Sequence, residues 1–368
     1  MENIGVSLCM IVKDEAELIQ KAILAAKPMV QEIVVVDTGS TDLTPVLAQN
    51  LGARVYSRDW NGNFADIRNF SIGKATQPYI LVLDADEIIL EGSMDILQIL
   101  LKRIDGISGS AGTITILNET MSGDISATNV VRIFPRDNRY QYKGKIHEQL
   151  TFRGKSIQHI IDSQIKVNHL GYIESQITKK NKYERNLKLL MSELSEGSDL
   201  SYIHFQIGRT YYVMKDYVQA EHFLNKSIEV ELRNGKRNFL SSALMTLGYC
   251  YIQLQKFDAL LECYKLAIEL FPDYTDLYFM YGVSLIESRN LHAFKEIPNV
   301  FKKCIELGEA SETKYETVQG VGSFKAHYNL ALFYELTGEL EKAAYHYKQS
   351  SSDGGYVQAQ ERLDRLLH

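Results

Sequence analysis

Short, mostly apolar runs alternate with amphipathic stretches over the first quarter of the chain. The runs are Val6–Val12, Ile33–Val36, Ala53–Tyr56 and Tyr79–Leu83. Apolar runs of this length are typical of strands that are buried on both faces of a sheet. Alternation of such strands with helical stretches predicts a doubly wound α/β sheet.

The stretches between these runs carry helix signals. Apolar residues recur at helical spacing in Ala16–Ala26 and in Phe64–Ala75, and a further helix is expected to begin near Leu43. Gly39 permits a tight turn before that helix, and Pro45 fits its first turn. No G-x-G-x-x-G pattern follows the first run, which disfavours a dinucleotide-binding fold.

The fourth apolar run ends abruptly in carboxylates. Asp84, Asp86 and Glu87 follow Leu83, at the edge where an open α/β sheet binds ligands. On an extended chain Asp84 and Asp86 would point the same way. Crowded carboxylates repel unless a cation or donors offset them, and a Mg²⁺-class ion that holds a diphosphate would do so. The alternative is a solvated acidic turn that closes the strand.

The chain beyond Glu87 reads differently. Gly112–Leu117 and Asn129–Phe134 are β-rich and are expected to form the acceptor side of a site. The stretch Arg136–Glu148 that follows is rich in charged and aromatic residues, which is typical of a functional loop.

The second half, from about Ser201, has the pattern of helical hairpins. Gly248 and Gly282 are 34 residues apart, and Ala331 and Ala343 are 12 apart. This spacing resembles that of tetratricopeptide repeats, whose stacked hairpins offer a concave surface for a polypeptide. Residues 308–322 interrupt the pattern and predict a loop. The expected domains are residues 1–174, a helical connector over 175–199, and an all-α repeat solenoid over 200–368.

Composition narrows the function classes. The 368 residues carry a formal charge of −6 with no basic block, which argues against a nucleic-acid partner. The four cysteines are scattered, as expected for reduced thiols of a cytoplasmic protein. No signal peptide is evident, and no apolar run approaches the roughly 20 residues that span a bilayer.

Four motifs in order resemble the nucleotide-binding half of family 2 glycosyltransferases, which have the α/β GT-A fold. They are V-S-L-C-M-I-V-K-D-E, V-V-V-D-T-G-S-T-D, F-A-D-I-R-N-F and I-L-V-L-D-A-D-E. The resemblance covers roughly residues 4–172. It implies an enzyme that takes a sugar from a nucleotide-sugar donor.

The resemblance also implies roles for individual residues. Asp37 would read the base, Arg68 would approach the nucleotide, Asp84 would reach the ribose and Asp86 would bind a divalent metal, Mn²⁺ or Mg²⁺. Nucleotide-sugar contacts are implied for Val12 and Ala85 as well. The alternatives are a turn-forming role for Asp37 and a solvated surface charge for Arg68.

An inverting transferase needs one base to take the acceptor proton. His147 and Glu148 are adjacent at the end of the aromatic loop, where relatives often carry His-Glu while others carry an acidic pair on a helix. Either residue would serve, and we favour Glu148. His169 resembles a histidine that several GT-A enzymes use as a metal ligand, and an imidazole ligand favours Mn²⁺ over Mg²⁺. A structural role is the alternative for His169.

These features together predict a cytoplasmic, metal-dependent, inverting hexosyltransferase with a UDP-linked donor. Family 2 domains joined to such repeats resemble bacterial enzymes that glycosylate bacteriocin peptides on cysteine or serine, so a peptide acceptor is expected. A transferase for cell-surface polysaccharide or lipid-linked sugar is one alternative, and a non-enzymatic nucleotide-binding scaffold is another. A homodimer through the repeats is expected, with the last repeat's aromatics at its interface: Tyr328, Phe333, Tyr334, Tyr345 and Tyr347.

Overall fold

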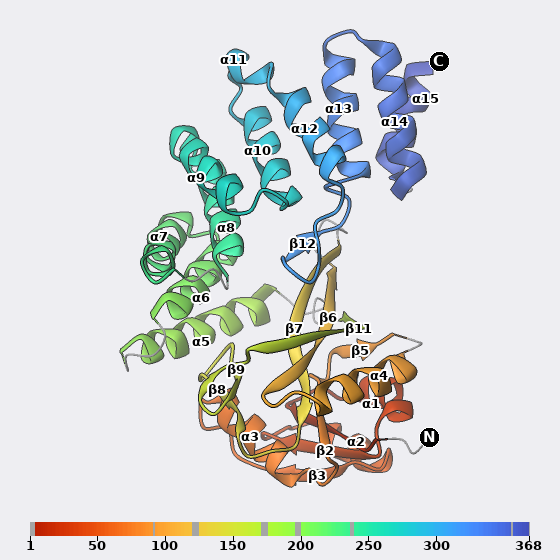
Figure 1. Ribbon diagram of the computed structural model, residues 1–368, viewed down its shortest axis with the longest axis vertical. Helices are drawn as coiled ribbons and strands as arrows, with labels where there is room; N and C mark the ends of the chain where they lie inside the picture. Colours follow the sequence, from red (N-terminus) through yellow and green to blue (C-terminus); the bar gives the residue numbers. More distant parts are fainter. Residues whose placement is uncertain are drawn as a thin grey trace. The chain divides into compact units, whose positions relative to one another are not determined.

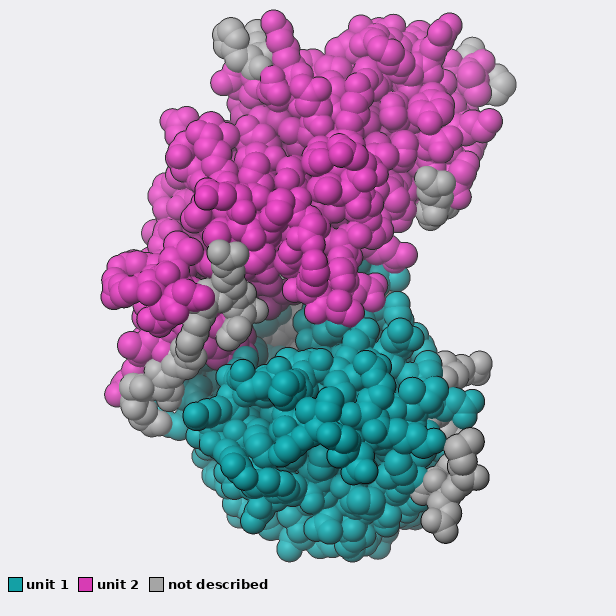
Figure 2. Space-filling model, in the orientation of Figure 1, with its two compact units in different colours: residues 1–193 teal, residues 194–368 magenta. Residues whose placement is uncertain are grey.

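The computed structural model describes residues 4–90, 93–119, 125–170, 176–195, 200–235, 239–354 and 356–367 (Figure 1). The chain forms two compact units, residues 1–193 and residues 194–368 (Figure 2). Within the described ranges, each helix is too short or too polar to span a bilayer.

Parallel strands form one half of the main sheet of the first unit, as the apolar runs predict. Their order is β3-β2-β1-β4, and each neighbouring pair is parallel. The bounds are β1 (Val6–Val12), β2 (Glu32–Asp37), β3 (Arg54–Ser57) and β4 (Tyr79–Val82). The connections contain α1 (Ile19–Ala26), η1 (Lys27–Met29), α2 (Thr44–Asn50) and α3 (Phe64–Lys74).

The other half of this sheet makes it mixed rather than wholly parallel. Beyond β4 the order continues β7-β6-β11-β5, with β7 antiparallel to β4 and β5 antiparallel to β11. The bounds are β5 (Glu87–Ile89), β6 (Ser110–Glu119), β7 (Ile125–Pro135) and β11 (His159–His169), and α4 (Ser93–Asp105) lies between β5 and β6 in the chain. The strands β4 and β5, consecutive in the chain, are therefore separated by three strands in the sheet.

Alternate residues of the central strands bury against different faces of the sheet. Leu8 and Leu81 belong to one hydrophobic cluster, whereas Cys9, Ile80 and Val82 belong to another. Side chains alternate across a strand, so a run that is apolar at every position fits a sheet that is covered on both faces. The core fixes the ends of these strands, and those ends carry the polar residues of the site.

A small antiparallel sheet is attached to α3. It contains β8 (Tyr140–Lys143), β9 (Gln149–Phe152) and β10 (Lys155–Ser156). The Asn69 side chain donates to the carbonyl of Tyr142 and accepts from its N–H, both at 2.9 Å. The loop between β8 and β9 contacts both neighbouring helices, because Phe64 N–H donates to the carbonyl of Lys145 and Lys145 N–H donates to Glu193 of α5 (Gln176–Ser195).

Helical hairpins build the second unit, as the repeat spacing predicts (Figure 1). A Cβ on Gly208 would lie 2.7 Å from Leu224 Cγ, so this glycine allows the two helices of the first hairpin to approach. The helices are α6 (Leu200–Val213), α7 (Tyr217–Arg233), α8 (Leu240–Gln253), α9 (Phe257–Leu270), α10 (Thr275–Glu287), α11 (Leu291–Phe294), α12 (Ile297–Leu307), α13 (Phe324–Leu336), α14 (Leu340–Gly354) and α15 (Val357–Leu367). The predicted interruption at 308–322 contains only the short β12 (Thr317–Val318) and turns.

The aromatic residues of the last repeat correct one prediction. Tyr347 and Tyr334 are buried in the core of the second unit, and Tyr328 and Phe333 pack against the same cluster. Only Tyr345 of the five expected interface residues is largely exposed. Tyr334 and Tyr347 fill the space between helices of one chain, so these two rings are not available to an apolar interface. The homodimer itself stays a prediction.

Candidate functional site

Asp84 lies between two arginines. Its Oδ1 is 2.8 Å from Arg68 Nη2 of α3, and its Oδ2 is 3.1 Å from Arg132 Nη2 of β7. Arg132 Nη2 also lies 3.0 Å from Glu87 Oε1. Asp84 N–H donates to Glu87 Oε2 at 2.9 Å, which stabilises the turn formed by residues 84–87. We call these four residues the acidic turn.

Arg68 continues this network to the aromatic loop. Its Nε forms an ion pair with Glu148 Oε1, and its guanidinium carbon lies 5.7 Å from the centre of the Tyr142 ring. Both Arg68 and Arg132 are buried. The network therefore joins three carboxylates to two guanidinium groups with a formal charge of −1, and it brings Arg68, Asp84 and Glu148 together from three separate segments.

Burial and charge act in opposite directions on these carboxylates. Burial alone would raise the pKa of Asp84, but the charges of Arg68 and Arg132 outweigh it and hold the pKa well below its usual range. Burial raises the pKa of Glu87 above its usual value although Arg132 opposes this, and the nearby Asp84 charge adds to the rise. Asp84 is thus held as an anion beside a more readily protonated Glu87.

Asp86 takes different partners from Asp84. The chain turns at residues 85–86, so the extended geometry on which the expected common direction of the two carboxylates rested does not apply. Asp86 Oδ2 lies 3.0 Å from His169 Nε2, and His169 Nδ1 lies 2.7 Å from Asn118 Oδ1. The hydrogen bond to Asp86 is the main cause that raises the pKa of His169. Leu170 N–H donates to the carbonyl of Asp86, which fixes the end of β11 to the turn.

Asp86 and His169 are the residues that could hold a divalent metal. A carboxylate oxygen and an imidazole nitrogen are both metal ligands, and Asp86 Oδ2 and His169 Nε2 lie at hydrogen-bond distance, 3.0 Å apart. Asn118 is placed to orient the imidazole through Nδ1. Among the described residues no group of three or more His, Cys, Asp or Glu could hold a metal. Water and diphosphate oxygens would complete the coordination, which is the usual arrangement for Mg²⁺-class ions.

Asp37 and Val12 lie side by side at the ends of β2 and β1. Asp37 Oδ2 accepts from the N–H groups of Gly39 and Ser40 at 3.1 Å each, and its Oδ1 accepts from Ser40 Oγ at 2.5 Å. The Val12 carbonyl accepts from both the N–H and the hydroxyl of Thr38. In this arrangement the Asp37 carboxylate stabilises the turn that follows β2. These contacts favour the turn-forming role that was the alternative for Asp37.

The two candidate bases have different surroundings. Glu148 is half-buried and paired with Arg68, whereas His147 is exposed and has a left-handed backbone with φ of 51°. A positive φ is uncommon for a residue other than glycine and often marks a functional loop. Glu148 is joined to Asp84 through Arg68. Ala85, between the two aspartates, is buried and sits in the turn.

Sequence reasoning missed Arg132, Glu87 as a partner, and Asn118. The signal for Arg132 was a single charge within the apolar strand V-V-R-I-F, since a charge in a buried strand needs a partner. Asn118 gave no comparable signal. Arg68 Nη1 and Arg132 Nε are buried and lack hydrogen-bond partners among the described residues, so the network retains unused donors.

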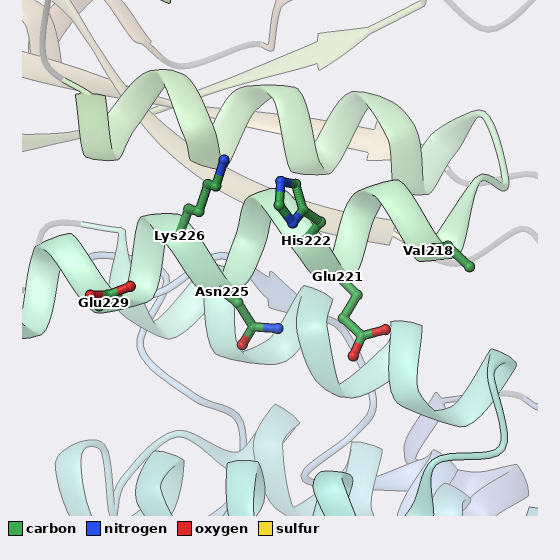
Figure 3. Close-up of a pocket in the computed structure, with 6 residues that line it drawn as sticks. All are labelled: Val218, Glu221, His222, Asn225, Lys226 and Glu229. Carbon is green, nitrogen blue, oxygen red and sulfur yellow. The ribbon is translucent and has the colours of Figure 1, made fainter.

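The second unit contains a shallow hollow on one helix, α7 (Figure 3). In Figure 3 the side chains of Lys226 and His222 point to one side of the helix, and those of Asn225 and Glu221 point to the other. These polar groups do not converge on one point. The hollow therefore lacks the convergent chemistry that the acidic turn has.

Two family models match separate parts of the chain. The model for glycosyl transferase family 2 matches residues 7–161, and a tetratricopeptide repeat model matches residues 241–274. The first match contains Asp37, Arg68, Asp84, Asp86 and Glu148.

Curated relatives match large parts of the chain. The chain is 30% identical over 232 residues to a TPR repeat-containing protein of Synechococcus elongatus, covering 61% of this chain and 56% of that protein. It is 25% identical over 286 residues to the SPbeta prophage-derived glycosyltransferase SunS of Bacillus subtilis, covering 76% of this chain and 67% of that protein. The chain thus spans little more than half the length of the first of these relatives. A solved structure of MamA has 22% identity and a TM-score of 0.36, and it covers 50% of this chain and 90% of that chain.

Proposed function

From the match of residues 7–161 to the family model for glycosyl transferase family 2, we propose that the protein is an inverting, metal-dependent hexosyltransferase that uses a UDP-linked sugar and a polypeptide acceptor. The observation that carries this proposal is the division of the acidic turn between two sets of partners. Asp84 is held by arginines, and Asp86 is held by a histidine.

This division suits a reaction that releases a nucleoside diphosphate. Asp86 and His169 would hold the divalent ion, and Asn118 would keep the imidazole in the orientation that binding requires. The ion would supply positive charge to stabilise the departing diphosphate. Arg68 and Arg132 fix Asp84 as an anion, which can accept hydrogen bonds from the ribose hydroxyls of the donor.

Glu148 is our candidate for the residue that receives the acceptor proton. Its Oε1 is engaged by Arg68, so the proton would go to Oε2. The same ion pair fixes the carboxylate relative to Asp84 and hence to the donor-binding side of the site. Holding a base and a bound reactant in one fixed geometry is a large part of what an enzyme contributes.

The repeats support a polypeptide as the acceptor class. A stack of hairpins presents a continuous surface that is suited to an extended chain. A relative whose match covers 76% of this chain is named a glycosyltransferase. A protein acceptor would engage more surface than the sugar site alone provides.

Calorimetry with UDP and mass spectrometry of sugar transfer test the proposal. UDP should bind only with Mn²⁺ or Mg²⁺ present, and Asp86→Ala should abolish turnover. Asp59→Ala is the matched control, because Asp59 is an exposed carboxylate of the same unit. Candidate peptides should gain the mass of one hexose when incubated with one of a panel of UDP-sugars. Equal UDP binding after chelation, or no binding of any nucleoside diphosphate, would refute the metal-dependent donor site.

A further inference from the structure

The segment between α12 and α13 is a closed loop. Residues 308–322, which we call the 308–322 loop, begin and end in contact, because a Cβ on Gly322 would lie 2.1 Å from the carbonyl carbon of Gly308. Compact loops whose ends meet are frequently functional. The proposed transferase chemistry makes no use of this loop.

One stretch of the loop lies against the first helices of three successive hairpins. Glu316 forms an ion pair of 2.8 Å with Arg209 of α6. The Tyr315 ring stacks on Tyr274, which precedes α10, with 4.2 Å between ring centres and 11° between ring planes. The Tyr274 hydroxyl donates to the carbonyl of Glu316 and lies 3.4 Å from Met245 Sδ of α8.

Side chains at the start of α10 hold both ends of this stretch. Val318 N–H donates to Asp276 Oδ1 at 2.7 Å. Asp273 accepts from Lys314 Nζ at 2.6 Å and from the Tyr315 hydroxyl at 2.5 Å. Four residues of the stretch 314–318 (Lys314, Tyr315, Glu316 and Val318) thus contact a surface that we call the first-helix face. We define it by Arg209, Met245, Asp273, Tyr274 and Asp276.

We propose that the first-helix face is a polypeptide-binding surface, that Lys314–Val318 is its internal ligand, and that a partner polypeptide binds there by displacing this stretch. The contacts define the partner's chemistry as an extended segment with an aromatic residue followed by an acidic one. The aromatic ring takes the place of Tyr315 on Tyr274, and the acidic side chain takes the place of Glu316 on Arg209.

The contacts that hold the internal ligand on the first-helix face can be broken without unfolding the helices. The Lys314–Asp273 ion pair is open to solvent, with side chains 61% and 49% exposed, and such a pair adds little to stability. The Arg209–Glu316 ion pair is less exposed, at 40% and 24%. Asp276 is buried, and its Oδ2 has no hydrogen-bond partner among the described residues. A buried polar atom without a partner is costly, so a polypeptide that also bonds to this atom would replace the internal ligand favourably.

Fluorescence anisotropy with a labelled peptide of residues 312–319, ETKYETVQ, tests displacement on the full chain. Tyr315→Ala with Glu316→Ala removes the internal anchors and leaves the first-helix face intact. This double variant should bind the peptide at least about tenfold more tightly than the unmodified chain, because the positions of the aromatic ring on Tyr274 and of the carboxylate on Arg209 are vacant and the remaining contacts of the stretch are easier to displace. Arg209→Ala added to the double variant should reverse the gain, and a scrambled peptide should not bind. Equal binding to the unmodified chain and the folded double variant, or binding to neither, would overturn the proposal.

Hydrogen exchange on the unmodified chain tests, without any variant, whether residues 314–318 leave the first-helix face. If the stretch opens by itself, the Val318 amide should exchange at least about tenfold faster than amides in the middle of α8 and α10. Exchange of Val318 only together with those helices would show that the stretch is a fixed part of the repeat core. Neither experiment uses a sugar, a nucleotide or a metal, so a negative result leaves the proposed transferase activity untouched.

Discussion

Arg68 and Glu148 are 80 residues apart in the chain and form a buried ion pair between α3 and the loop that joins β8 to β9. Because Arg68 also binds Asp84, this pair links the candidate base to the candidate donor site.

Glu148→Gln should lower kcat by about 10²–10⁴ if Glu148 is the base. The amide oxygen can still accept from Arg68, so the affinity for UDP should stay within a few-fold of the original. His147→Ala is the matched control, since His147 is the exposed neighbour, and it should keep most of the activity. Steady-state kinetics and UDP calorimetry measure both quantities. An inactive His147→Ala beside an active Glu148→Gln would assign the base to His147.

Asn118→Ala should weaken metal binding without touching a ligand. Loss of a group that orients a metal-bound histidine typically costs about 10- to 100-fold in metal affinity. Asn129→Ala is the control, because Asn129 is an asparagine of the same sheet whose side chain bonds Thr115 instead of His169. Titration of UDP binding against Mn²⁺ gives the apparent metal affinity. Equal Mn²⁺ titration curves for the two variants would indicate that His169 has a structural role and does not bind the metal.

Arg132→Met should destabilise the first unit by about 3–5 kcal/mol, because it leaves the buried Glu87 carboxylate without its partner. Adding Glu87→Met should recover much of this loss, since no unpaired charge then remains. Trp60 is the only tryptophan in the sequence, and its ring centre lies 4.5 Å from that of Phe64 at the start of α3. Its fluorescence during urea unfolding therefore reports this unit. A double variant less stable than Arg132→Met would contradict the charge argument.

Asp276 should make the stability of the second unit depend on pH. Burial raises its pKa to about 7, Glu309 adds to the rise, and Lys325 and the Val318 N–H oppose it. Cys304 and Tyr274 also lie within its electrostatic reach. The folded-state pKa lies above the unfolded value of about 4, so the folded state holds the extra proton between them.

The unfolding free energy should therefore fall as pH rises from about 4 to about 7, by up to about 4 kcal/mol from this group. Asp276→Asn can still accept from Val318 and should remove this part of the pH dependence. Denaturant unfolding followed by circular dichroism at several pH values measures the difference between the two chains. Parallel curves for both chains would show that Asp276 is not the titrating group.

The apolar runs, alternating with helical stretches, were sufficient to predict the parallel half of the sheet. The pattern is clearest for β1, β2 and β4, whose residues are almost all buried, whereas β3 at the edge is partly exposed. The hairpins were likewise predictable from Gly248 and Gly282, since a glycine at a close helix contact recurs with the repeat. The placement of β7 beside β4 could not be predicted in this way, because strand order is set by contacts between segments that are distant in the chain. Arg132 was missed for that reason, as its partners Asp84 and Glu87 come within reach only through this pairing.

The sequence brought Asp86 and His169 into one hypothesis from motifs 83 positions apart, and the two side chains lie 3.0 Å from each other. Their role as metal ligands stays a prediction. The extended geometry assumed for Asp84 and Asp86 does not apply because the chain turns at residues 85–86, and local sequence does not distinguish a strand end from a turn at that point. The aromatic residues near the C-terminus were misjudged because a ring that fills a repeat core looks the same in sequence as one at an interface.

The segment 83–86 has to connect the middle of the sheet to its edge. Four strand spacings separate β4 from β5, which would amount to about 19 Å in a flat sheet. The chain from Val82 to Glu87 spans at most about 17 Å when fully extended, and it contains a turn. The sheet must therefore curl. Asp84 and Asp86 belong to the short connecting segment whose length limits how flat the sheet can be. A substitution that weakens the pairing of β5 with β11 would therefore give the segment 83–86 more freedom. It would alter the spacing of Asp84 and Asp86 without touching either residue.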